Sequence, residues 1–166
     1  SVVLVAWVLG RDPQRRIAVI SHSQALAADL ASKTIKLMTS DFYQRAFPNL
    51  HLRDNGRKVM DFVTTDGGGR YAASFETGIT GRGFDLIIID DPISAHHVKS
   101  EKERTNVNEN FDTMIASRLD DQLRGAMIVV GQRMHEDDLS GSLLQKGGWK
   151  QVCLPLVAEE DAIYPL

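Results

Sequence analysis

The chain has 166 residues, a formal net charge of −3 and 43% hydrophobic residues. This length and balance are typical of a single globular domain with a core of its own. They argue against a membrane protein, because no apolar run reaches the roughly 20 residues that a bilayer-crossing helix needs. They also argue against a free-standing basic DNA-binding domain, because the 19 Lys and Arg residues are outnumbered by 22 Asp and Glu residues. Any contact with DNA would therefore be local or supplied by another domain or subunit.

The first half of the chain predicts a strand between helices, followed by a hairpin. Gly10 is expected to end the first helix, and Ser21 and Gln24 stand at the spacing of a capping box before the second. Glycines 67–69 are expected to form the turn of the hairpin. The predicted elements are a helix at 1–9, a strand at 17–20, a helix at 26–38, a short helix at 42–47, and hairpin strands at 59–63 and 71–75.

The second half predicts strands that alternate with amphipathic helices. Ser100 and Glu103 again have capping-box spacing before a helix with one apolar face. The predicted elements are a strand at 85–90, a helix at 100–119, a strand at 126–130, a helix at 137–146 and a final strand at 150–154. Near-continuous apolar strands between such helices indicate an α/β fold with a mostly parallel sheet covered on both faces, in a single domain over residues 1–166.

Both ends of the chain suggest a piece of a longer protein. Ser1 opens an apolar stretch without a start methionine, and the last residues follow an acidic stretch, Glu159 to Asp161. The phosphate-binding pattern G-x-x-x-x-G-K-[S/T] does not occur in the sequence. The single cysteine, Cys153, precludes an internal disulfide and is typical of a reducing cytoplasm.

Two acids, Asp90 and Asp91, stand at the end of the strand at 85–90 and indicate metal-dependent chemistry. Ligands of a parallel α/β sheet bind beyond the carboxyl ends of its strands, where Asp90 and Asp91 are expected. In nucleoside-triphosphate hydrolysis, one such carboxylate holds Mg²⁺ and a second orients or deprotonates the attacking water. The alternative is an apolar strand followed by acids in an ordinary turn.

Three other segments carry candidate chemistry. Gln132, directly after Gly131 and the strand at 126–130, could sense a γ-phosphate, or it could be a solvated turn residue. Arg82, between two glycines, could stabilise transferring phosphate as an arginine finger, or it could be a surface arginine. The acids of segment 135–138 are explained more simply as helix caps than as metal ligands.

Together these residues resemble the ATPase domain of phage terminase large subunits, the DNA-packaging motors of tailed bacteriophages. The likeness covers essentially the whole chain, and the second and third of its four blocks are specific in combination. The blocks are residues 17–23 with the alanine-rich helix behind them, Thr80 to Pro92, Gly131 to Leu139, and Gly148 to Pro155.

The resemblance implies a RecA-like, P-loop ATPase core, truncated at its N-terminus, that uses ATP and Mg²⁺. Asp90 would be the magnesium-associated Walker B acid and Asp91 the catalytic carboxylate, although the family often has glutamate at the second position. Gln132 would belong to the motif that couples hydrolysis to DNA movement, and Arg82 would act in trans on a neighbouring subunit. The phosphate-binding Walker A loop would precede Ser1, and a nuclease domain would follow the chain, so this piece alone is expected to be inactive.

The same resemblance implies the partners and the location. They are double-stranded DNA, a terminase small subunit, a portal protein and further copies in a homo-oligomeric ring, all in the host cytoplasm. Two alternatives stay open: a helicase-like RecA-fold ATPase, and a non-catalytic interaction module that has kept the fold but lost hydrolysis.

Overall fold

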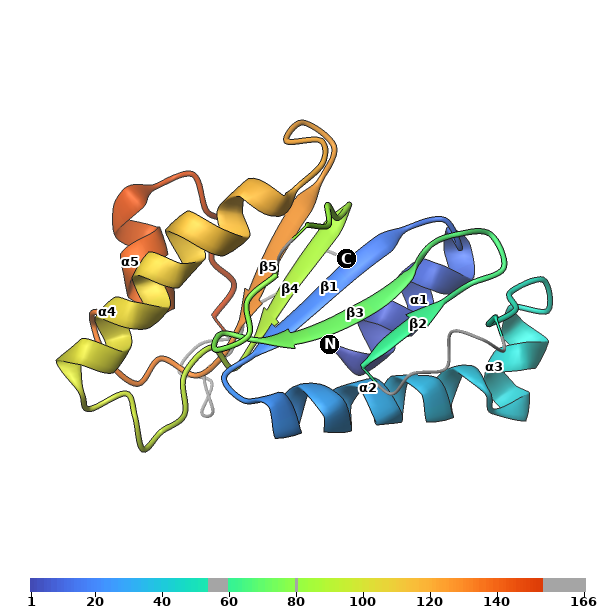
Figure 1. The fold of residues 1–166 in the computed structure, drawn as a ribbon, viewed down its shortest axis with the longest axis horizontal. Helices are drawn as coiled ribbons and strands as arrows, with labels where there is room; N and C mark the ends of the chain where they lie inside the picture. Colours follow the sequence, from blue (N-terminus) through green and yellow to red (C-terminus); the bar gives the residue numbers. More distant parts are fainter. Residues whose placement is uncertain (54–59, 80, 154–166) are drawn as a thin grey trace, which may run out of the picture.

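A computed structural model describes residues 1–53, 60–79 and 81–153. It shows a five-stranded mixed sheet flanked by helices (Figure 1). The strands are β1 (Arg16–Ser21), β2 (Asp61–Val63), β3 (Gly69–Ser74), β4 (Leu86–Asp90) and β5 (Ala126–Val130). The helices are α1 (Val2–Arg11), α2 (Gln24–Met38), α3 (Asp41–Ala46), α4 (Glu101–Asn110) and α5 (Leu139–Lys146). Within these ranges no helix is both long enough and apolar enough to cross a bilayer.

The strand order is β2-β3-β1-β4-β5. The pairings of β3 with β1, β1 with β4 and β4 with β5 are parallel, as the sequence predicted. The pairing of β2 with β3 is antiparallel, which confirms the hairpin and makes the sheet mixed. Because β1, β4 and β5 are parallel, their carboxyl ends meet at one edge of the sheet, called the carboxyl edge below.

Each face of the sheet is covered by its own helices. Alternate residues of a strand point to opposite faces. On one face, Ile17 and Val19 of β1 pack with Leu86 and Ile88 of β4 against α1. On the other face, the intervening residues pack against α4 and α5. The core therefore has two apolar layers, and the middle strands β1 and β4 are buried on both sides.

Three expected helix boundaries, in α1, α2 and α5, were wrong. The last of these helices begins at Leu139 instead of residue 137. The first helix continues through Gly10 to Arg11, and a methyl group on Gly10 would come within 2.6 Å of the Phe47 ring. The glycine thus allows α1 to pack closely on Phe47. The N-cap of α2 is Ser23, whose hydroxyl accepts a hydrogen bond from Leu26 N, because Ser21 is still paired within the sheet.

The helix predicted at 100–119 is divided. Ser100 caps α4 as expected and accepts a hydrogen bond from Glu103 N. After α4 the chain continues as a π-helical turn, Phe111–Ile115, and a 3₁₀ turn, Ala116–Arg118. Both Phe111 and Ile115 are buried in the core, so the change of period keeps these two side chains on the sheet side.

The final strand expected at 150–154 was wrong over residues 150–153, and Leu154, like Val59 of the predicted hairpin, lies outside the described residues. Trp149 packs its ring against Phe111, with the ring centroids 6.1 Å apart. Residues 150–153 are exposed, Cys153 included, and they line a cavity of about 380 Å³ beside β5 and α5.

Candidate active site

The carboxyl edge brings the predicted acids next to the segment that follows β5. Asp90 is the last residue of β4, and it points to the α1 side of the sheet together with Leu86 and Ile88. Asp91 is the next residue, and its backbone N–H donates a hydrogen bond of 2.9 Å to the carbonyl of Val130. The ends of β4 and β5 are thus joined at the site.

Asp90 lies against the amino end of α1. Ser1 is the N-cap of this helix, and its backbone nitrogen is 3.8 Å from Oδ2 of Asp90. The Ser1 hydroxyl is buried and finds no hydrogen-bond partner in the described ranges. The amino end of a helix carries partial positive charge and free N–H groups that attract anions. The junction of Ser1 and Asp90 is therefore a polar contact between a helix end and a carboxylate.

Asp91 has a backbone conformation that few side chains adopt. Its φ is +52°, and no other described residue apart from glycines has a positive φ. Such a conformation costs on the order of 1 kcal/mol, least for Asp and Asn. The extended backbone of β4 ends before this residue, and the Asp91 side chain is exposed at the edge. Backbone strain of this kind is often found at functional sites.

His22 holds the Asp91 turn from the neighbouring strand. It follows β1, and its backbone N–H donates a hydrogen bond of 3.0 Å to the Asp91 carbonyl. Its ring Nδ1 is 3.1 Å from the same oxygen. A carbonyl oxygen only accepts hydrogen bonds, so Nδ1 carries the proton and, in the neutral ring, Nε2 is left as an acceptor. His22 thus links β1 to the strained residue of β4.

Gln132 and Gly131 lie on the far side of Asp91. Both are exposed and follow β5 directly. A methyl group on Gly131 would be 3.7 Å from Oδ1 of Asp91 and 3.3 Å from Cδ of Pro92. Asp91, Gly131 and Gln132 line the same small cavity. The two predicted site residues at the ends of β4 and β5 are therefore neighbours.

The acidic segment after Gln132 forms a helix cap. Asp138 is the buried N-cap of α5, and its Oδ1 accepts a hydrogen bond of 2.9 Å from Gly141 N. Its Oδ2 accepts from the backbone N–H groups of Met134 and His135 at 3.1 and 3.3 Å. Arg133 Nε is 3.2 Å from Oδ1 of Asp138. The prediction that the acids of this segment cap a helix is confirmed for Asp138 alone, because no acid lies in the first turn of α5. The cap also fixes the loop that carries Gln132.

Arg82 lies away from this cluster. It precedes β4, at the amino edge of the sheet, whereas Asp90 ends the strand. Its Nη1 donates a hydrogen bond of 2.6 Å to Asp61 Oδ2, and its guanidinium lies over the Tyr71 ring, 4.8 Å from the centroid. The hydrogen bond to Asp61 raises the pKa of Arg82 above its ordinary value. Arg82 does not meet the carboxyl-edge residues of its own chain.

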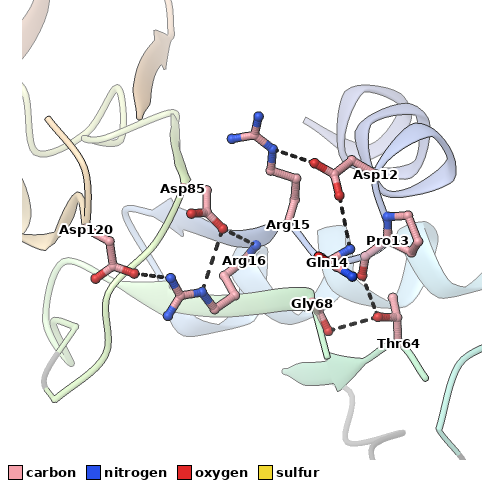
Figure 2. A network of polar contacts seen from close by, with 9 residues as sticks. All are labelled: Asp12, Pro13, Gln14, Arg15, Arg16, Thr64, Gly68, Asp85 and Asp120. Carbon is pink, nitrogen blue, oxygen red and sulfur yellow. Dashed lines mark hydrogen bonds and ion pairs between the residues drawn. The ribbon is translucent and has the colours of Figure 1, made fainter. Parts of the chain in front are cut away.

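The amino edge has polar contacts that connect strands to loops (Figure 2). The backbone N–H of Arg16 donates a hydrogen bond of 2.8 Å to Asp85 Oδ2, and its guanidinium pairs with Asp85 and Asp120. Thr64 Oγ1 donates a hydrogen bond of 2.6 Å to the carbonyl of Pro13. These groups satisfy one another, so this edge is explained as structural support.

The carboxyl edge fits a magnesium ion. Mg²⁺ takes oxygen ligands, and in nucleotide sites the protein supplies only one or two of them beside phosphates and waters. The Asp90 carboxylate and the unpartnered Ser1 hydroxyl match that donor set. Larger groups of three or more His, Cys, Asp or Glu side chains arranged for a metal are absent from the described residues.

Asp90, Asp91 and Gln132 of this edge were expected from the sequence, whereas Ser1 and His22 were not. Ser1 could have been found as the residue that opens the first helix, and His22 as the residue that follows the strand next to β4.

A comparison with models of known protein families and a comparison with curated protein sequences each found no match.

Proposed function

We propose that this chain is the hydrolytic part of an ATP-driven motor, the ATPase domain of a phage terminase large subunit. The observation that carries the proposal is the junction at the carboxyl edge. There Oδ2 of Asp90 lies 3.8 Å from the backbone nitrogen of Ser1, whose hydroxyl is buried and finds no partner among the described residues. The strained Asp91 follows Asp90 and lies beside Gln132. Acids at a strand end opposite a helix amino end are the arrangement that nucleoside-triphosphate hydrolysis uses.

The position of each residue at the carboxyl edge indicates a different role in hydrolysis. Asp90 and Ser1, on the α1 side, would hold Mg²⁺, which neutralises charge on the phosphates when it is bound. Asp91 is exposed and points away from the strand, so its carboxylate would orient the attacking water and accept its proton. His22 and the Val130 carbonyl hold the backbone of Asp91 on both sides and so fix the direction of that carboxylate.

The motor function rests on the sequence blocks around these residues. The segments Thr80 to Pro92 and Gly131 to Leu139 together resemble the terminase pattern. Gln132, next to Asp91, would couple hydrolysis of the γ-phosphate to movement of DNA. Double-stranded DNA, a small subunit, a portal protein and a homo-oligomeric ring are the partners that this proposal includes. The net charge of −3 implies that each copy contributes only local contacts to DNA.

The function is tested on the intact protein that contains this chain. Release of phosphate from ATP is measured with Mg²⁺, with and without linear double-stranded DNA. The proposal predicts hydrolysis that requires the metal and rises severalfold when DNA is added. A hydrolysis rate that does not change when DNA is added would contradict the packaging-motor function. Absence of any hydrolysis would support the non-catalytic alternative.

The position of Arg82 gives a prediction about the ring. Because Arg82 is distant from its own Asp91, a finger role requires a neighbouring copy. Arg82→Ala and Asp91→Asn proteins are each expected to be nearly inactive, and mixing them is expected to restore part of the hydrolysis. Restoration occurs where an intact Arg82 meets an intact Asp91 across an interface.

The control is Asp61→Asn, which removes the partner of Arg82 but keeps the arginine. Arg82 is exposed and Asp61 is partly exposed, so loss of this ion pair is expected to change stability by less than about 1 kcal/mol. This variant is expected to keep hydrolysis. If the mixture stayed as inactive as its components, Arg82 would not act in trans.

A further inference from the structure

Arg70 of β3 is a buried charge without a hydrogen-bond partner. Its side chain is 1% exposed, and its Nε, Nη1 and Nη2 find no acceptor in the described part of the chain. Buried arginines are normally paired, because an unpaired charge in the interior costs several kcal/mol. Burial lowers the pKa of Arg70 to about 10, which leaves the guanidinium charged at neutral pH. The fold thus retains an internal positive charge.

The sheet register places this charge on the same face as Asp90. Arg70 is paired with Ile17 of β1, and Ile17 is paired with Leu86 of β4. Paired residues of neighbouring strands point to the same face, and so do residues an even number of positions apart. Asp90 is four positions after Leu86. Arg70 and Asp90 therefore both point to the side covered by α1 and α2.

Asp90 is also the charged group that acts on Arg70. Its negative charge raises the pKa of Arg70 against the opposing effect of burial. A long arginine side chain can direct its guanidinium along the sheet face toward the carboxyl edge. In the interior, where water screens little, charges interact over longer distances than at the surface.

Other unpartnered groups gather at the same place. The Ser1 hydroxyl lies at the Asp90 junction, as described above. Ser21 is buried and its hydroxyl lacks a partner among the described residues. Ser21 follows Ile20, which is paired with Ile89, so it is level with Asp90 on the α1 side. Five of the seven unpartnered buried atoms in the described ranges belong to Ser1, Ser21 and Arg70.

We propose that Arg70 is a positioning residue for Asp90: its buried charge holds that carboxylate at the amino end of α1, beside Ser1. The value of this arrangement for metal binding rests on the proposed function, but the coupling between the two charges does not. Arg70 has no access to solvent, so it acts through Asp90 and not by touching a nucleotide.

The coupling is measured in a double-mutant cycle of chemical unfolding, without nucleotide or metal. The variants of the intact protein are Arg70→Met, Asp90→Asn and both together. Asp90→Asn is expected to destabilise the protein that has Arg70, because the buried guanidinium then loses its counter-charge. It is expected to have little effect in the Arg70→Met protein. The predicted coupling is about tenfold in the unfolding equilibrium constant.

Two further variants make the test specific. Arg70→Lys keeps the charge and is expected to keep most of the coupling. A second cycle replaces Asp90→Asn by Asp91→Asn, the adjacent exposed acid, and is expected to be additive. Additive effects of Arg70→Met and Asp90→Asn would overturn the proposal. A failure of Arg70→Met to fold would overturn it too, because methionine suits a buried position and a positioning role implies that the fold persists without Arg70. Neither result depends on whether the protein hydrolyses ATP.

Discussion

Asp138→Ala is expected to destabilise the fold by about 3 kcal/mol and to lower the Tm by roughly 10 °C. The carboxylate is buried, and it accepts hydrogen bonds from three backbone N–H groups and pairs with Arg133. Alanine would leave these donors unpaired and remove the cap of α5. Leu139 and Leu143 of that helix are core residues, so loss of the cap also weakens the packing of α5 on the sheet. Thermal unfolding followed by circular dichroism measures the change.

Asp137→Ala is the matched control. Asp137 is adjacent in sequence and also acidic, but its side chain is 60% exposed. Its replacement is expected to change stability by less than about 0.5 kcal/mol. Equal effects of the two alanine variants would show that the cap of α5 does not depend on Asp138.

Much of the sheet could be predicted from the sequence. The run that became β4 is apolar up to Asp90 and is buried as expected. The apolar run that became β5 was also expected to be buried, but it is an edge strand that is only partly covered. Such runs are a strong signal because parallel strands are buried on both faces. The position of Asp90 and Gln132 at one edge followed from the parallel direction of these strands alone.

The rest of the site depends on contacts between distant parts of the chain. His22 and Asp91 are 69 residues apart, and nothing in either local sequence indicates that the ring of His22 supports the Asp91 turn. Ser1 meets Asp90 only because α1 packs across β4. These contacts arise from the packing of helices on the sheet, which residue spacing does not specify.

Arg70 and the expected last strand show two limits of hydrophobic pattern. An arginine within an alternating strand suggests an exposed face, but α2 packs on that face of β3. Conversely, Val152 and Cys153 suggested a strand, yet both are exposed and lie outside the sheet. Burial in these positions is decided by neighbouring elements and not by the residues themselves.

Asp91→Asn is expected to lower the rate of ATP hydrolysis by about 10²–10⁴-fold. The change removes the negative charge that accepts a proton from water but keeps the shape of the side chain. Asparagine tolerates a positive φ as aspartate does, so the turn held by His22 and Val130 is expected to persist. Unfolding of the variant is therefore expected to match the wild type within about 0.5 kcal/mol.

The central claim, that the carboxyl edge hydrolyses ATP, is tested most directly by phosphate release from the intact protein on double-stranded DNA. Wild type, Asp91→Asn and the exposed-acid control Asp137→Asn are compared at saturating ATP and Mg²⁺. The predicted result is full activity in the wild type and the control, with near-complete loss in Asp91→Asn at unchanged stability. Wild-type activity in the Asp91→Asn protein would contradict the account, because the carboxylate on the strained residue would then have no part in the reaction.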